Sequence, residues 1–166
     1  MRTAGVARDE VKGNPITRAG YDKLVAERDR LWKVERPKVT QEVSDAAALG
    51  DRSENAEYIY GKKKLREIDK RLHFLNDKIE RAVVVDPATL SGDRVVFGAT
   101  VTVEDENGKK STYQIVGEDE VDAANGRISH KSPVGRALLG KQPGDVVTVL
   151  RPAGEIELEI LKLEFK

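Results

Sequence analysis

The sequence contains no cysteine and only two histidines among its 166 residues. Without cysteine the chain has no disulfide, no thiolate nucleophile and no Cys-ligated zinc or iron–sulfur site. His73 and His130 are too few for a His-rich metal centre, and Ser132 has no evident His/Asp partners. The glycines form neither a GxGxxG pattern nor a P-loop. The sequence therefore predicts no autonomous active site.

Aromatic residues and long apolar runs are also scarce. Aromatics make up 5% of the chain, whereas charged residues make up 35%. No stretch approaches the roughly 20 apolar residues of a membrane span. The first sixteen residues lack the apolar centre of a signal peptide. We expect a cytoplasmic protein with no membrane partner, a modest core, and one part that is long and solvated.

Charge is balanced over the whole chain but unevenly distributed along it. Residues 1–86 carry 19 Lys+Arg and 16 Asp+Glu, and residues 87–166 carry 10 and 13. Six cations fall within ten residues of the first part and define a basic stripe, namely Lys62, Lys63, Lys64, Arg66, Lys70 and Arg71. Such a stripe is usual on the solvated face of a coiled coil. It is also suited to guiding nucleic-acid phosphates.

Residues 17–49 have the pattern of one long helix. Thr17 is a suitable N-cap residue, and Gly50 suits the left-handed conformation that ends helices. Apolar residues recur every seven positions, at Val25, Trp32, Val39 and Ala46, and Tyr21, Leu24, Leu31 and Val43 widen that stripe. Pro37 lies inside the pattern and lacks an amide hydrogen, so we expect a kink near residues 34–36.

A second helix is predicted to begin soon after Gly50 and to end near Arg81. Its apolar positions alternate three and four residues apart, at Tyr58, Gly61, Leu65, Ile68, Leu72, Leu75 and Ile79. Two apolar seams joined by a short link can be buried only by folding back on each other. We therefore expect an antiparallel coiled-coil hairpin, about 45 Å long for roughly 30 residues.

After Pro87 the apolar pattern alternates with a period of two. Strands are expected at residues 94–97, 100–103, 111–116, 145–150 and 155–160, with turns at 106–109 and 152–154. Ser132-Pro133 should cap a short helix that ends at Gly140. The fold class is α+β. We expect a flexible extension (1–15), the hairpin with an acidic tip at 50–58 (16–86), and an antiparallel-sheet domain (87–166).

Two carboxylates at the expected tip admit two interpretations. Asp51 and Glu54 are three residues apart before a helix, which is the spacing of a capping box. Alternatively, the pair could share a divalent ion with another molecule, because Mg²⁺ is usually held by one or two carboxylates plus substrate phosphates. Spacing alone leaves both interpretations open.

The residues around these acids resemble a known family. Residues 49–58 read LGDRSENAEY, which is similar to the tip signature of bacterial Gre transcript-cleavage factors. The run KKKLREIDKR at 62–71, Leu31-Trp32 and Glu35-Arg36-Pro37 resemble the GreB branch. Matching segments in the second half are residues 97–99, 115–117 and 132–138. The resemblance covers roughly residues 16–164, with one departure at Gly135, where the family favours alanine.

The resemblance implies a cofactor of RNA polymerase rather than an enzyme. An FKBP-like C-terminal domain would bind at the rim of the polymerase secondary channel, with Ser132, Pro133 and Arg136 as docking residues. The coiled coil would enter the channel, where Asp51 and Glu54 coordinate a Mg²⁺ shared with the polymerase and Ser53 assists. The basic stripe would guide the RNA 3′ end of a backtracked complex. No tightly bound cofactor is implied, and the protein would be monomeric.

Two other functions fit the same general architecture. A Gre-fold relative could enter the channel and inhibit the polymerase, but such relatives tend to alter the tip, and Asp51 and Glu54 are both present here. An FKBP-type prolyl isomerase would need an aromatic-lined pocket. Residues 87–166 offer only Phe97, Tyr113 and Phe165, so we set the isomerase aside.

Overall fold

A computed structural model describes residues 13–50 and 54–166 of the chain. The described residues form two compact units. The helical unit comprises Tyr21–Arg81, and the sheet unit combines residues 13–20 with Ala82–Lys166. The hairpin predicted at 16–86 is thus about five residues longer at each end than the helical unit. No helix in the described ranges is long and apolar enough to cross a membrane.

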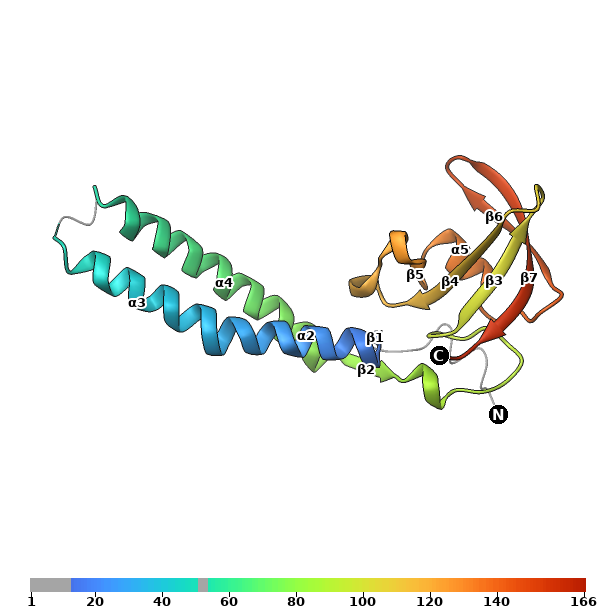
Figure 1. Ribbon diagram of the computed structural model, residues 1–166, viewed down its shortest axis with the longest axis horizontal. Helices are drawn as coiled ribbons and strands as arrows, with labels where there is room; N and C mark the ends of the chain where they lie inside the picture. The colour runs from blue at the N-terminus through green and yellow to red at the C-terminus, as the bar shows by residue number, and fades with distance from the viewer. Residues whose placement is uncertain (1–12, 51–53) are drawn as a thin grey trace. The chain divides into compact units, whose positions relative to one another are not determined.

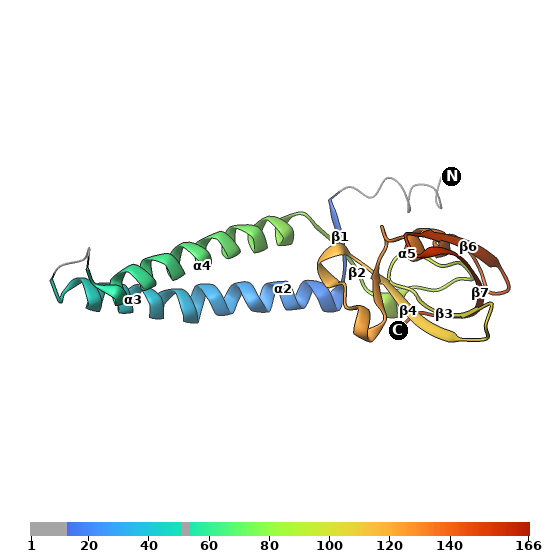
Figure 2. The same cartoon turned by 90° about the horizontal axis from the view of Figure 1, so that it is seen from above.

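The helical unit is an antiparallel hairpin (Figure 1). Its first arm consists of α2 (Arg18–Arg30), a π-helical turn (Leu31–Glu35) and α3 (Arg36–Ala47). Its second arm is α4 (Ala56–Glu80), which lies beside the first arm in both Figure 1 and Figure 2. All seven predicted seam residues of α4 are buried or half-buried. The predicted seam of the second helix is confirmed.

The first arm departs from the predicted register at one turn. Its buried positions are Leu24, Leu31, Val39 and Ala46, which are spaced seven, eight and seven residues apart. The prediction that Trp32 lies in the seam is wrong, because its side chain is 59% exposed and Leu31 takes its place. The Arg36 amide donates to the carbonyl of Leu31, five residues back, so a wider π-helical turn absorbs the extra residue.

Pro37 explains why this turn lies where it does. Proline removes one amide donor from the helical ladder, and the π-helical turn ends at Glu35, two residues before it. The structure thus contains a change of helix type close to the predicted kink. The chain is α-helical before and after the π-helical turn. In α3 the buried residues Val39 and Ala46 keep the predicted spacing of seven residues.

The sheet unit contains two sheets. Strands β1 (Asn14–Thr17) and β2 (Ala82–Val85) form a parallel pair. The larger sheet has the order β5-β4-β3-β7-β6. Its strands are β3 (Thr100–Asp105), β4 (Lys110–Val116), β5 (Arg127–Ser129), β6 (Val146–Arg151) and β7 (Gly154–Glu164). Helix α5 (Pro133–Leu138) and three 3-10 turns, at Pro87–Thr89, Glu118–Glu120 and Ala123–Asn125, complete the unit.

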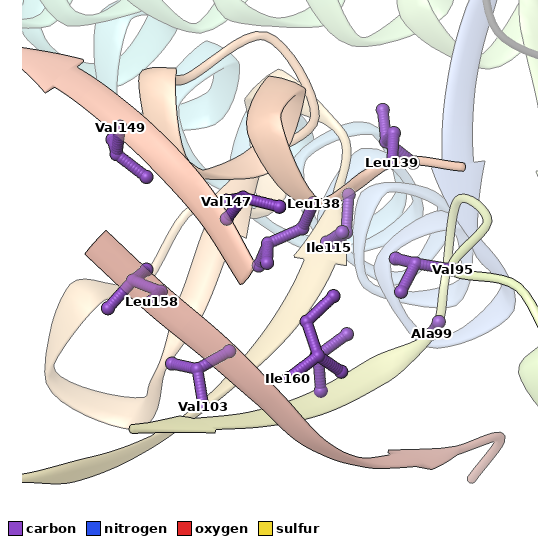
Figure 3. Close-up of a cluster of buried hydrophobic side chains, with 11 residues drawn as sticks. Val95, Ala99, Val103, Ile115, Leu138, Leu139, Val147, Val149, Leu158 and Ile160 are labelled. Atoms are coloured by element: carbon purple, nitrogen blue, oxygen red, sulfur yellow. The ribbon is translucent and has the colours of Figure 1, made fainter. Parts of the chain in front are cut away.

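The core of the sheet unit lies between the large sheet and α5 (Figure 3). Val103, Leu158 and Ile160 project from β3 and β7 toward Leu138 of α5. Ile115, Leu138 and Ile160 are at most 1% exposed. These aliphatic side chains follow the period-two pattern read from the sequence, and the α+β fold class is confirmed.

Several predicted boundaries change in the structure. The sheet is mixed rather than wholly antiparallel, because β5 pairs with β4 in parallel. Residues 94–97 are not a strand. Val95 instead exchanges single backbone hydrogen bonds with Gly140 and Lys141, at 2.8 and 2.7 Å. Asn14 and Pro15, predicted to lie in a flexible extension, pair with β2, and residues 1–12 lie outside the described residues.

A carboxylate from the second half of the chain holds the start of α2. Glu120 accepts hydrogen bonds from the Thr17 amide and the Gly117 amide, each at 2.9 Å, and from the Thr17 hydroxyl. The Thr17 oxygen in turn accepts from the Gly20 amide at 3.2 Å, as an N-cap does. The predicted N-cap at Thr17 is confirmed. The carboxylate that binds it, Glu120, lies 103 residues later in the chain.

The burial of Leu31 in place of Trp32 can be tested by replacing each residue with alanine. Leu31→Ala should lower the free energy of unfolding by about 2 kcal/mol or more, because a seam side chain is lost. Trp32→Ala should cost less than about 1 kcal/mol, since the indole is exposed and contacts chiefly Arg36, 5.7 Å from the ring centroid. Urea unfolding of both variants measures the difference. The opposite ranking would contradict the observed register.

Candidate functional site

The start of α4 is capped by Asn55 rather than by Asp51. Asn55 has extended backbone angles (φ −84°, ψ 101°), and its Oδ1 accepts from the Tyr58 amide at 3.0 Å. Helix α4 begins at Ala56, so a box with Asp51 as N-cap and Glu54 as its third residue does not exist. For Glu54 the capping interpretation is wrong, because this residue precedes the N-cap, whereas Asp51 lies outside the described residues.

The same Asn55 side chain also reaches the first arm of the hairpin. Its Nδ2 donates to the carbonyl oxygen of Ala46 at 2.8 Å. That carbonyl also accepts from the Leu49 amide at 3.2 Å, in the last turn after α3. Asn55 therefore joins the carboxyl end of α3 to the amino end of α4. Gly50, with φ of 118°, follows the end of α3.

The tip acids are only partly within the described residues. Asp51 and Ser53 lie outside them. Glu54 is exposed and precedes the helix, so its carboxylate is free of a capping role. Among the described residues no three metal-binding side chains come together. Exposed carboxylates are nevertheless suitable oxygen ligands for Mg²⁺ when another molecule supplies the remaining ligands.

The basic stripe separates into five free cations and one paired cation. Lys62, Lys63, Arg66 and Lys70 are exposed and Lys64 is half-buried, and none forms an ion pair with a described residue. These five residues remain available to an external phosphate chain.

Arg71, the sixth member, forms an ion pair within the protein. Its guanidinium donates two hydrogen bonds to the carboxylate of Glu27, at 2.7 and 2.8 Å, and lies 5.0 Å from the Phe74 ring centroid. The hydrogen bonds from Arg71 hold the pKa of Glu27 below its ordinary value. A second interhelical pair, Arg36–Asp69 at 2.7 Å, neutralises one of the two acids within the stripe. Arg71 therefore stabilises the hairpin instead of extending the free basic surface.

The predicted docking residues lie on α5 and have different surroundings. The Ser132 hydroxyl donates to the Ser129 carbonyl at 2.6 Å and accepts from the Gly135 amide at 3.1 Å, so it caps α5. Pro133 and Arg136 are exposed. Only these last two residues present free surface to a partner, while Ser132 shapes the turn that carries them.

Gly135 is buried where the chain has no room for a larger residue. A Cβ built on it would lie 2.3 Å from the Ser129 carbonyl oxygen, the same atom that accepts from Ser132. Alanine, which the resemblance led us to expect at this position, does not fit this tight turn without a backbone shift. The departure noted in the sequence thus has a steric reason.

The site contains one residue whose role the sequence analysis missed. Asn55 appeared only as part of the LGDRSENAEY motif, although asparagine directly before a helix is a favoured N-cap. That signal identifies the helix start. The bond from its amide to Ala46, nine residues earlier, leaves no comparable signal in the sequence.

Because Gly135 is crowded by the Ser129 carbonyl, its replacement by alanine should lower the stability of the protein. Gly135→Ala should lower the free energy of unfolding by about 1–3 kcal/mol, as overpacking does, despite the better helix propensity of alanine. Arg136→Ala, on the exposed side of α5, is the control and should change it by less than about 0.5 kcal/mol. Thermal unfolding compares them. A stabilised Gly135→Ala variant would show that the turn relaxes freely.

Two family profiles match nearly the whole described chain. Residues 14–84 match "Transcription elongation factor, N-terminal", and residues 90–165 match "Transcription elongation factor, GreA/GreB, C-term". The boundary between the two matches falls just after β2.

Individual relatives agree with the family profiles. The chain is 52% identical over 155 residues to transcription elongation factor GreB of Yersinia pestis, covering 93% of this chain and 91% of that protein. It is 53% identical over 154 residues to GreB of Pseudomonas aeruginosa, covering 92% of each. Among solved structures, GreA factor homolog 1 of Thermus thermophilus is 26% identical, covering 92% of this chain and 99% of that one, with a TM-score of only 0.42.

Proposed function

Because the chain belongs to the GreA/GreB family of transcription elongation factors, we propose that it stimulates the cleavage of backtracked RNA by RNA polymerase. In this proposal the hairpin enters the secondary channel of the polymerase and brings its tip to the active centre. The observation that carries the proposal is the cap on α4. Asn55 supplies the N-cap, which leaves the adjacent Glu54 exposed and free to bind elsewhere.

The dimensions of the hairpin suit a channel. Helix α4 contains 25 residues, which at 1.5 Å per residue gives about 37 Å. Two packed helices form a narrow element with a mainly apolar seam and many charged side chains on its other faces. Interhelical ion pairs, Arg71–Glu27 and Arg36–Asp69, lie along it and join its two arms.

Asp51 and Glu54 would supply the carboxylate oxygens at the tip. Mg²⁺ bound there with the polymerase would activate water and offset the charge that develops on the scissile phosphate. The chain itself contributes negative charge and oxygen ligands at the end of a rigid support, with Ser53 beside them in sequence. Two carboxylates alone make a weak site, so binding would require the ligands of the polymerase.

The basic stripe and the exposed residues of α5 would bind RNA and the polymerase, respectively. The five free cations of the basic stripe would contact the phosphates of the extruded RNA 3′ end. Pro133 and Arg136 of α5 would dock on the channel rim, with Ser132 holding their turn. The protein would act as a cytoplasmic monomer and as a cofactor in trans, with the chemistry performed by the polymerase.

The tip acids can be tested without altering the fold. The double variant Asp51→Asn, Glu54→Gln should abolish cleavage stimulation and leave the free energy of unfolding within about 0.5 kcal/mol of wild type, because Asn55 supplies the N-cap of α4. A backtracked elongation complex with end-labelled RNA, incubated with Mg²⁺, reports shortening and resumed synthesis. Glu57→Gln, an exposed acid in the first turn of α4, is the matched control and should cleave normally.

Other outcomes of the same assay have clear meanings. Normal cleavage by the double variant would disprove the role of the tip acids. If the wild-type protein slows nucleotide addition without shortening the RNA, the chain is an inhibitor that enters the channel.

The basic stripe predicts a dependence on RNA length. Lys62→Glu with Lys63→Glu should reduce cleavage of long extruded RNA more than that of short RNA, and should lower the salt sensitivity on the long substrate. Lys33→Glu with Lys38→Glu changes the same charge at two exposed positions of the first arm and is the control. Equal losses on long and short RNA would count against RNA guidance.

A further inference from the structure

We infer that Asn55 is a positioning residue that joins the two arms at the end of the hairpin and thereby holds Glu54, its neighbour in the chain, in place. The inference deepens the proposed function and rests on it for its activity readout. Asn55 touches neither metal nor RNA in this scheme. It acts through the two helix ends that it connects.

The geometry uses both ends of one planar amide. The Oδ1 atom accepts from the Tyr58 amide at 3.0 Å, and the Nδ2 atom donates to the Ala46 carbonyl at 2.8 Å. Ala46 itself is only 3% exposed and is the last buried residue of the first arm. Beyond it Ala47 is half-buried, and Leu49 is 76% exposed. Apolar packing therefore ends at Ala46, and a polar bond continues the contact between the arms.

The bond joins two described residues that flank the tip acids in the sequence. Ala46 and Asn55 are nine residues apart, and positions 51 and 54 both lie between them in the chain. Helix ends fray where their terminal groups lack partners. A hydrogen bond between the two helix ends holds the start of α4 against the first arm, and Glu54 directly precedes the residue that makes this bond.

Asparagine is the residue that can do both tasks. Aspartate and serine are equally good N-caps. An ionised aspartate carboxylate, however, has no hydrogen to donate to the Ala46 carbonyl. The serine side chain is shorter than that of asparagine and does not extend as far toward this carbonyl. Replacing Asn55 by either residue should keep the start of α4 and remove the tie to Ala46. The two variants differ in charge, so a shared effect cannot come from charge at the tip.

Metal ligands must be held closely for catalysis. A displacement of about 1 Å in a positioned group can cost on the order of a hundredfold in rate. Loss of the tie should therefore lower the maximal cleavage rate while docking, which occurs through other residues, is unchanged. The Mg²⁺ concentration needed for half-maximal cleavage should rise as well, because a less firmly held Glu54 carboxylate binds the ion less well.

The mechanical part of the inference is tested without polymerase. The chain has no cysteine, so Leu49→Cys with Ile59→Cys provides two unique spin-label sites, at exposed positions 76% and 52% accessible. Electron–electron distance measurements should give a narrow distribution with Asn55 and a broader one with Asn55→Ser or Asn55→Asp. An unchanged distribution in both variants would overturn the joining of the two arms by Asn55.

The functional part uses full-length protein and backtracked complexes. Asn55→Ser and Asn55→Asp should each lower the maximal cleavage rate by about tenfold or more. The factor concentration at half-maximal rate and the melting temperature should stay near those of wild type. Asn76→Ser, an exposed asparagine within α4, is the control and should match wild type throughout.

The outcomes separate the inference from the proposed function. A wild-type maximal rate in either Asn55 variant, or a loss that appears only as weaker binding, overturns the positioning role. If the wild-type protein does not stimulate cleavage at all, the proposed function fails. The spin-label distances then still decide whether Asn55 joins the two arms.

Discussion

The hairpin depends on one continuous apolar seam between its two arms. A pair of long, highly charged helices has no other extensive surface to bury, so the arms must keep their apolar residues facing each other over their whole length. Pro37 disturbs this alignment of apolar residues because it removes one backbone hydrogen bond from the helix. The π-helical turn at Leu31–Glu35 restores it by absorbing one residue, and the seam continues through Val39 to Ala46. The π-helical turn therefore keeps the apolar residues of the first arm facing the second arm.

Much of the fold could be predicted because periodicity reflects burial directly. The 3-4 spacing of α4, the period-two strands and the Ser-Pro cap of α5 all appear in the structure. The errors arise where contacts are distant in sequence. Trp32 matched a heptad that fails once the π-helical turn is inserted, and β1 exists only because β2, 68 residues later, pairs with it. Residues 94–97 have strand-like composition but bond to the loop after α5 instead.

The candidate site was predictable in its chemistry more than in its geometry. The sequence identified the acids and the cations, because charge and spacing are visible in a single chain. It did not reveal that Arg71 is paired with Glu27, 44 residues away, or that Gly135 lies against the Ser129 carbonyl. The choice between capping and ligand roles for Glu54 also required knowing where α4 begins. These facts depend on the position of neighbours that sequence spacing does not encode.

The carboxylate of Glu120 has a consequence for the order in which the protein can be completed. Its partner Thr17, whose hydroxyl caps α2, leaves the ribosome about a hundred residues earlier, so this N-cap lacks its carboxylate partner until Glu120 has been synthesised. The arms of the hairpin can meet as soon as α4 has emerged. The base of α2 is finished only when β2 and then Glu120 arrive. The contacts around the Thr17 N-cap are thus completed late, although Thr17 is synthesised long before Glu120.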